Sequence, residues 1–172
     1  MPALLILGAI AALAPVPGAF GDQQRAYPAM RHEGAAYAVA TDAKGRIVNC
    51  LPLDPTADAA KVRAACAAIT AKGVPASIAP ATASGTADDW FPSAEYPADA
   101  IPRRSSGSVT VVYEVDERGA AVNCIVQRSS GVAMFDLAAC RAMLKRARFA
   151  PASYQGKPVH AAAIATFAYD SQ

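Results

Sequence analysis

Hydrophobic residues occupy every second position over one stretch in the second half of the chain. The alternating positions are Val109, Val111, Tyr113 and Val115. This period of two predicts a β-strand with one buried face. Residues 116–119 (Asp-Glu-Arg-Gly) then predict a tight hairpin turn, because glycine readily adopts a positive φ. A return strand would place Val122, Cys124 and Val126 on the core face.

A helix is predicted after this hairpin. Ser129, Ser130 and Gly131 end the strand, and a serine there is well placed to cap the helix. The apolar positions of the helix share one side: Leu137, Cys140, Leu144 and Ala147. A basic face on another side holds Arg141, Lys145 and Arg148. Two interpretations of this basic face stay open: contact with an acidic partner or lipopolysaccharide phosphates, or a solvated face that suits a helix C-terminus.

The last strand is predicted over residues 159–169, after a turn-rich link at residues 153–158. The residues of this strand that share one face are Val159, Ala161, Ala163, Ala165, Phe167 and Tyr169. The order strand, strand, helix, strand predicts an α+β fold, with an antiparallel sheet and the helix on one face.

A fainter copy of this unit lies in the first half of the chain. Residues 42–50, DAKGRIVNC, match residues 116–124, DERGAAVNC, at an offset of 74. Further on, Ile-Ala-Pro-Ala at residues 78–81 matches Phe-Ala-Pro-Ala at residues 149–152. In so alanine-rich a chain, alanine matches are expected by chance, but the shared Asp, Gly and Val-Asn-Cys are not. We therefore interpret the pattern as an internal duplication.

The first copy is predicted to hold strands at residues 35–41 and 46–51 and a helix at residues 57–72. The inward positions of that helix are Val62, Cys66 and Ile69. The pattern predicts no third strand after Gly85. Residues 80–95 have the composition of a linker, which we place at residues 86–95, with Trp90 and Phe91 packing back onto a domain.

Each copy carries two cysteines at the same spacing. In the second copy Cys124 lies on the core face of a strand and Cys140 on the core face of the following helix, so packing would bring them together. We predict the disulfides Cys50–Cys66 and Cys124–Cys140, each closing a loop of about 17 residues and stabilising the fold by about 3 kcal/mol. Four buried free thiols are the alternative, because the pairing depends on export to an oxidising compartment.

The composition bounds the fold and the location. A chain of 172 residues has room for one ordinary domain or two small ones. With 53% hydrophobic but only 7% aromatic residues, the core is alanine-rich and would benefit from covalent links. Residues 1–21 resemble a secretory signal, with an apolar run to Ala14 and small residues for cleavage near Ala19. An uncleaved membrane anchor at residues 3–20 is the alternative, and we expect a periplasmic protein.

Several function classes are disfavoured. A net charge of +2 is too small to indicate nucleic-acid binding by charge alone. His32 and His160 have no acidic cluster beside them, and zinc usually needs three or four ligands, so we expect no metal and no cofactor. The cysteine spacing differs from the C-x-x-C of redox enzymes, and Ser129 and Ser130 have no base nearby in sequence. We expect a non-catalytic protein.

A series of short features follows in order between residues 95 and 170. They are Tyr96-Pro97 with Ala100, Gly107 with Val109, Val115 with Gly119, Ser129-Ser130-Gly131, Phe135-Asp136, Arg146 with Arg148, Phe149 and Pro151, and Gly156-Lys157-Pro158-Val159. In this order and spacing they resemble the C-terminal domain of the TonB family. The first copy keeps Tyr27-Pro28, Gly34, the turn at residues 42–45 and the cysteines, so it resembles a second, eroded unit.

The resemblance implies a periplasmic αββαβ domain at residues 96–172 and a degenerate copy of it at residues 26–85. In the family, this domain binds the TonB-box segment of outer-membrane transporters by adding a strand at an exposed sheet edge. By position, that edge is here the last strand. The expected partner-binding residues are Val159, His160, Ala161, Ala163, Ala165, Phe167 and Tyr169. A core or edge strand without a partner is the alternative.

The chain also departs from the family's full-length energy transducers, which carry a membrane helix with a functional histidine and a long proline-rich spacer. Residues 1–21 contain no histidine, and the chain has no extended proline-rich segment, so we expect a stand-alone module. Pro102 is expected to limit the family's first helix, at residues 96–104, to one turn. A structural envelope protein, whose tandem units pack on each other and use up the sheet edge, is the second hypothesis. Homodimerisation is left open.

Overall fold

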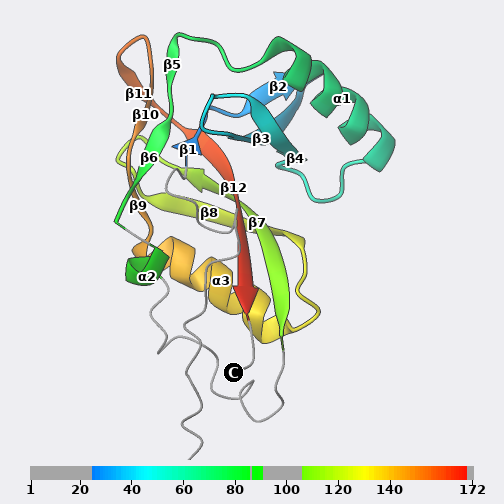
Figure 1. The fold of residues 1–172 in the computed structure, drawn as a ribbon, viewed down its shortest axis with the longest axis vertical. Coiled ribbons are helices and arrows are strands. Elements are labelled where there is room, and N and C mark those ends of the chain that lie inside the picture. Colours follow the sequence, from blue (N-terminus) through cyan, green and yellow to red (C-terminus); the bar gives the residue numbers. More distant parts are fainter. Residues whose placement is uncertain (1–24, 86, 91–105, 170–172) are drawn as a thin grey trace, which may run out of the picture.

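Two three-stranded antiparallel sheets, each with a helix on one face, form the frame of the protein (Figure 1). The computed structural model describes residues 25–85, 87–90 and 106–169. The elements are β1 (Arg25–Ala26), β2 (Met30–His32), β3 (Ala35–Thr41), β4 (Ile47–Pro52), α1 (Ala59–Lys72), β5 (Ile78–Ala79), β6 (Ala81–Ser84), α2 (Ala87–Trp90), β7 (Gly107–Val115), β8 (Ala121–Arg128), α3 (Ala133–Arg146), β9 (Arg148–Ala150), β10 (Ala152–Tyr154), β11 (Lys157–Val159) and β12 (Ala161–Tyr169). The predicted α+β class is confirmed.

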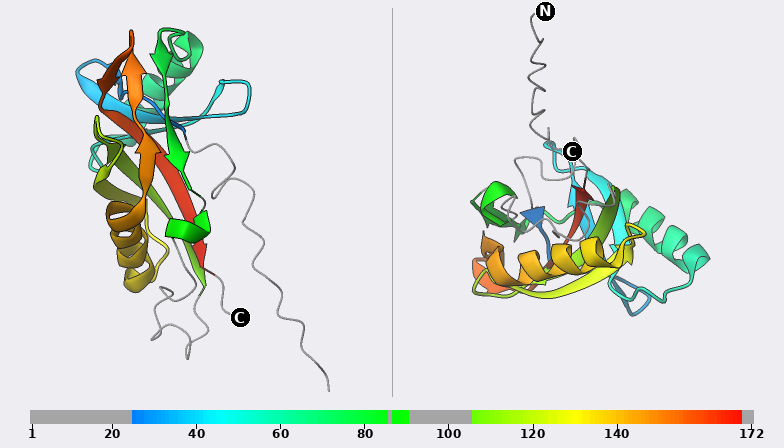
Figure 2. Two further views of the ribbon diagram at one scale, coloured as in Figure 1. Left: turned by 90° about the vertical axis from the view of Figure 1, so that its left-hand side faces the viewer. Right: turned by 90° about the horizontal axis from the view of Figure 1, so that it is seen from below.

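The second unit consists of the sheet β12-β7-β8 and the helix α3. β12 pairs with β7 from Ala161 opposite Val115 to Tyr169 opposite Gly107, without a shift in register. Figure 2 shows α3 lying across one face of this sheet. The alternating strand residues of β7 point to α3 and are fully buried there, and they pack with Ala139 and Met143. The predicted order of strand, strand, helix and last strand is confirmed.

A β-bulge changes which residues of β8 face the core. Val115 pairs with Ala121 and Glu114 pairs with Asn123, so Val122 is the extra residue between them. Ala121 takes the core position, and Val122 is 49% exposed. The prediction that Val122 lies on the core face is therefore wrong, because the bulge resets the alternation. The first unit has the same irregularity at Val48, which is 65% exposed.

The helix α3 turns a different face to the sheet than its hydrophobic pattern predicts. Leu137 is 64% exposed and Leu144 is 42% exposed, so their predicted core positions are wrong. The buried residues of the helix are Phe135, Ala139, Ala142 and Met143. The alanines let the helix approach the sheet closely, and Phe135 and Met143 fill the remaining space. Cys140 is only partly buried, because its partner Cys124 lies on the edge strand and holds it at the flank of the helix.

The first unit repeats this plan with the sheet β2-β3-β4 and the helix α1. The predicted strands and helix are present with shifts of one or two residues at their ends. Asp58 caps α1 by accepting hydrogen bonds from the backbone N–H groups of Ala60 and Lys61. Ile69 is buried, and Val62 and Cys66 pack against the same cluster, as predicted. The sequence pattern predicts no third strand after Gly85 for this sheet. Instead β2, which precedes β3 in the chain, pairs with β3 as the third strand.

The two units are joined by strand pairs that cross between them. β5 pairs with β10 and β6 pairs with β9, both antiparallel. Residues 78–84 and 148–154 thus run along each other in one register, from Ser84 opposite Arg148 to Ile78 opposite Tyr154. These are the segments that carry the repeated Ala-Pro-Ala, and each proline lies in the middle of its segment, where it interrupts the ladder. The matched segments of the two copies therefore pair with one another.

Part of the expected linker is structured. β6 and the short helix α2 occupy residues 81–84 and 87–90 of the stretch whose composition predicts a linker. Trp90 is buried and packs on Phe149, with ring centroids 5.3 Å apart, as predicted for this residue. Phe91, the expected signal at residues 1–21 and the expected first helix at residues 96–104 lie outside the described residues. Within the described ranges no helix has the length and apolar character that a membrane crossing needs.

Candidate partner-binding edge

The strand expected at residues 159–169 is in fact two strands. Val159 belongs to β11 and pairs with Ala152 of β10. His160 separates the two strands and is exposed. β12 begins at Ala161 and pairs with β7 instead. The continuous strand predicted from the sequence is therefore wrong at its start, and Val159 and His160 lie outside the edge that the remaining residues form.

The side chains expected to bind a partner lie mostly in the core. Ala161, Ala163, Ala165 and Phe167 are each less than 5% exposed and pack in the cluster beneath α3. Tyr169 stacks on Phe135, with ring centroids 4.3 Å apart and planes inclined by 6°. These side chains therefore contribute to the fold. A strand added to β12 would form hydrogen bonds with the backbone of the residues that lie between them in the strand.

In β12, the backbone N–H and C=O groups of every second residue point away from β7, toward the outside of the sheet. These groups form the outer row of the strand. At Ala162 both groups of this row are used: the N–H of Tyr27 donates to its carbonyl (3.1 Å) and its own N–H donates to the carbonyl of Tyr27 (2.7 Å). Because the β12–β7 register runs without a shift, the same row continues at Ile164, Thr166 and Ala168. In the described part of the chain, no strand pairs with this row beyond Ala162.

The side chains along this row differ in their roles. Ile164 packs against the first unit, in a cluster with Ala38, Val112 and Leu51. The hydroxyl groups of Thr166 and Thr110 form a hydrogen bond of 3.0 Å across the β12–β7 pair. Ala168 is exposed. The far end of the row is thus the part with the least side-chain bulk.

The outer edges of β8 and β4 are less suited to strand addition. The side-chain oxygen of Asn123 accepts the backbone N–H of Cys124 at 2.9 Å. In the first unit Asn49 accepts the N–H of Cys50 in the same way, at 2.8 Å. Both edges also carry a bulge. Occupied donors and a bulged backbone are devices that protect an edge strand from further pairing.

The two predicted disulfides are present. Cys50–Cys66 joins β4 to α1 with 5.7 Å between the Cα atoms, and Cys124–Cys140 joins β8 to α3 with 5.5 Å. Each ties the helix of its unit to the edge strand that precedes it. The bonds thus stabilise the two sheets, one of which carries the β12 edge, in a core that is rich in alanine.

The Ser129-Ser130-Gly131 motif holds the loop before α3, although not by the predicted cap. The N-cap residue is Val132, which forms no side-chain hydrogen bond to the helix. Instead the Ser129 and Ser130 hydroxyls donate to the Asp136 carboxylate at 2.6 and 2.7 Å, and the Ser130 N–H donates at 2.9 Å. Burial raises the pKa of Asp136, but these hydrogen bonds outweigh it and hold the pKa below its ordinary value. This is a structural contact.

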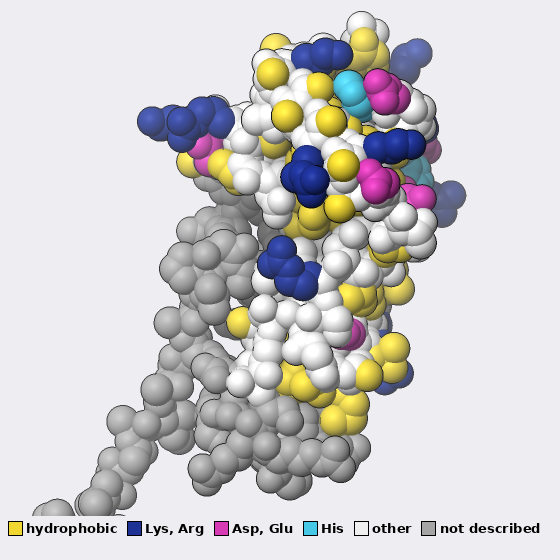
Figure 3. Space-filling model, turned by 90° about the vertical axis from the view of Figure 1, so that its right-hand side faces the viewer, with side chains coloured by type: hydrophobic (Ala, Val, Ile, Leu, Met, Phe, Trp, Pro, Cys, Tyr) yellow, Lys and Arg dark blue, Asp and Glu magenta, His cyan; other side chains and the backbone are white. Residues whose placement is uncertain are grey.

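The predicted basic face contains two residues of α3 rather than three. Arg148 lies on β9, and its guanidinium donates to the carbonyl groups of Ala147 (2.8 Å) and Lys145 (3.2 Å). It therefore satisfies carbonyls at the helix C-terminus. Figure 3 shows that basic side chains on one face of the molecule are scattered and interspersed with acidic ones. Among the described residues, no group of three or more His, Cys, Asp or Glu side chains is placed to hold a metal ion.

The family assignment rests on the second unit. Residues 92–170 match the family model described as Gram-negative bacterial TonB protein C-terminal. This part of the chain is similar to the TonB C-terminal domain. Domains of this family mediate protein–protein interactions, and the match suggests involvement in TonB-dependent transport. A comparison with curated proteins finds no match. The first unit lies outside the matched residues.

The sequence predicts the edge strand but not the contact that occupies the first position of its outer row. The contact of Tyr27 with Ala162 joins residues far apart in the chain, and no local pattern signals it. The repeated Val-Asn-Cys is the signal that marks the protected edges, because both bulges and both asparagine contacts fall on it. The second unit therefore retains one outer row, which begins where the contact with the first unit ends.

Proposed function

We propose that this protein is a non-catalytic, periplasmic interaction module of TonB-dependent outer-membrane transport. It binds an extended peptide segment, such as a TonB box, by strand addition along the outer row of β12. The observation that carries this proposal is the hydrogen-bonding row that continues past Ala162 to Ala168 without a paired strand among the described residues. In strand addition the backbone hydrogen bonds supply affinity, and a few side chains supply selectivity.

Two further observations support the proposal. The two disulfides fit an oxidising compartment such as the periplasm. The edges of β8 and β4 are protected by asparagine side chains and bulges, which leaves β12 as the better edge for a partner strand. A peptide that pairs with β12 would extend the sheet β12-β7-β8 by one strand.

In this proposal the first unit is a degenerate copy of the domain formed by the second unit. Its turn, bulge, disulfide and helix recur at the same offset as in the second unit. It covers the face of the second sheet that is turned away from α3, through Ala38, Leu51, Val112 and Ala162. Tyr27 also takes the first position of the outer row, and so sets where an added strand can begin.

That same packing favours one alternative, a structural envelope protein whose two units use up each other's surfaces. Here the first unit covers a sheet face and part of the β12 edge, and no external strand is required. The two functions differ in one measurable respect, since only the interaction module binds a peptide at the outer row.

The test uses a labelled TonB-box peptide and a scrambled peptide of the same composition, with binding measured by fluorescence anisotropy. Ala168→Pro removes one outward N–H of the edge while the inward bonds to β7 remain. Ala168→Ser is the matched control, because it keeps the N–H. We expect the proline variant to bind at least about fivefold more weakly, since one hydrogen bond contributes about 1 kcal/mol, and the serine variant to bind as the wild type does.

Two results contradict the proposal. In one, the wild type binds the TonB-box and scrambled peptides equally or binds neither. In the other, the proline and serine variants bind the peptide alike, which would place the peptide elsewhere. Circular dichroism of each variant checks that the fold is kept.

A further inference from the structure

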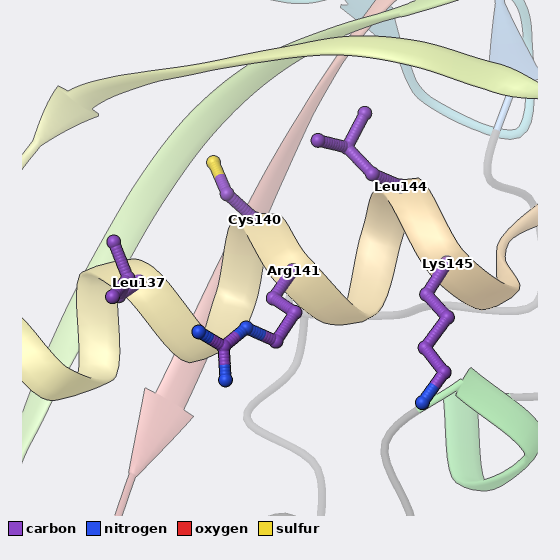
Figure 4. A pocket seen from close by; sticks show the side chains of 5 residues that line it. All are labelled: Leu137, Cys140, Arg141, Leu144 and Lys145. Atoms are coloured by element: carbon purple, nitrogen blue, oxygen red, sulfur yellow. The ribbon is translucent and has the colours of Figure 1, made fainter.

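A shallow groove with a volume of about 550 Å³ runs along the outward face of α3. The described residues that line it come from this helix: Leu137, Cys140, Arg141, Leu144 and Lys145. Figure 4 shows that Leu137, Cys140 and Leu144 point to one side of the helix, whereas Arg141 and Lys145 extend away from them. The face thus has an apolar row with a cationic row beside it.

The two leucines of the apolar row are not part of the core of the domain, whereas Cys140 is held by its disulfide. Leu137 is 64% exposed and Leu144 is 42% exposed, and both lie apart from the cluster that joins α3 to its sheet. The cationic row is equally uncommitted. Arg141 and Lys145 are exposed, and among the described residues neither side chain has an ion-pair or hydrogen-bond partner.

The first unit supplies an internal comparison for this face. α1 spans Ala59–Lys72 and α3 spans Ala133–Arg146, so the two helices correspond residue by residue. The positions of Leu137 and Leu144 are taken in α1 by Arg63 and Thr70, both exposed. The positions of Arg141 and Lys145 are taken by Ala67 and Ala71. Two helices with the same disulfide and packing role therefore differ in this outward face.

The chemistry of the face defines the partner that fits it. Leu137 and Leu144 are two turns apart, about 10 Å along the axis, which is the spacing of anchors that a short amphipathic helix presents to a groove. The cations beside them favour carboxylates on the flank of that helix. A second copy of this chain fits less well, because two-fold packing through α3 would bring Arg141 of each copy together.

We infer that the outward face of α3 is a docking groove for an acidic amphipathic helical segment of a partner protein. The leucine anchors of that segment lie between Leu137 and Leu144, and its glutamate or aspartate side chains pair with Arg141 and Lys145. The groove is separate from the β12 edge, so the module contacts a second element in addition to an extended peptide.

The experiment uses a synthetic helical peptide of about 18 residues, five turns long, with leucines on one face and glutamates on the flanks. Binding to the full chain with its disulfides intact is measured by fluorescence anisotropy. We expect Leu137→Arg/Leu144→Thr, which installs the side chains of α1, to weaken binding by about tenfold or more. Arg141→Ala/Lys145→Ala should weaken it several-fold and remove most of its dependence on salt.

Two controls distinguish binding at this groove from binding elsewhere on the protein. Arg63→Ala changes an exposed residue of α1 and should leave the affinity unchanged. Ala168→Pro, which disrupts the β12 edge, should also leave the affinity for the acidic peptide unchanged. Binding at the two surfaces is thus tested independently. All the substituted positions are exposed, and urea unfolding is expected to be close to that of the wild type.

Several results would overturn the inference. One is that the wild type does not bind the acidic peptide, or binds a peptide with lysines in place of the glutamates equally well. Another is that the double leucine variant keeps full affinity. A third is that phosphatidylglycerol vesicles bind through Leu137 and Leu144 while the peptide does not, which would make the face a membrane contact. Self-association lost in the leucine variant would likewise assign the face to a second copy.

Discussion

Gly119 lies at the point where the hairpin of the second unit touches the strand that crosses to the first unit. Its φ is +82°. Its carbonyl accepts the backbone N–H of Phe149 at 2.8 Å, and a Cβ atom added at this glycine would lie 1.8 Å from the Phe149 carbonyl oxygen. Gly45 is the matching glycine of the first hairpin, with a φ of +78°, but it has no atom within 4 Å of an added Cβ. Comparing alanine substitutions at these two glycines therefore separates the effect of backbone strain from the effect of the close contact with Phe149.

We expect Gly119→Ala to lower the free energy of unfolding by about 3–5 kcal/mol, and Gly45→Ala by about 1 kcal/mol. Both alanines are strained at positive φ, at about 1–2 kcal/mol, partly offset by lower entropy of the unfolded chain. Only Gly119→Ala also displaces Phe149, losing a hydrogen bond of about 1 kcal/mol. The displacement further disturbs the contacts of that ring with Trp90 (5.3 Å) and Tyr113 (5.6 Å), at about 1–3 kcal/mol.

Urea unfolding of the oxidised protein, followed by far-UV circular dichroism, gives both free energies. Hydrogen exchange supplies a second readout, because Phe149 pairs with Ala83 and its displacement should loosen β6 as well. If the two variants lose the same stability within about 0.5 kcal/mol, the close approach of Gly119 to Phe149 contributes nothing beyond backbone strain. In that case the added methyl group would not displace Phe149.

The remaining predictions concern the disulfides and the loop before α3. Cys124→Ala/Cys140→Ala and Cys50→Ala/Cys66→Ala should each cost about 3 kcal/mol in urea unfolding, since both bonds close loops of the same length; a loss below about 1 kcal/mol in either would contradict the chain-entropy argument. Asp136→Asn should lower stability at neutral pH by about 1 kcal/mol or more, because charge-assisted hydrogen bonds from Ser129 and Ser130 are weakened. The folded-state pKa of Asp136 lies below its ordinary value of 3.8, so its contribution is complete above that value and is lost as the pH falls further. The stabilities of wild type and Asp136→Asn should therefore converge below pH 3.8, and a constant difference down to about pH 2 would contradict this assignment.

Short stretches of sequence are sufficient to form the local units of this protein. The Asp-x-x-Gly turns form because Asp42 and Asp116 each accept two backbone N–H groups within their own turn. These hydrogen bonds also hold the pKa of both carboxylates below the ordinary value. The cysteine pairs follow from the short strand–helix connection, which leaves each pair close together. The TonB-like features of the second unit are local in the same way.

Which faces and edges remain available depends on contacts between distant parts of the chain. A bulge at Val122 resets the alternation of β8, and the hydrophobic pattern of the strand does not show it, because the pairing with β7 sets the register. Leu137 and Leu144 look like core positions, but α3 packs through its alanine row and leaves them outside. The pairing of residues 78–84 with 148–154, and of Tyr27 with Ala162, joins segments far apart in the chain. Local patterns carry no information on such contacts, because their free energy comes from surfaces that meet only when both units have folded.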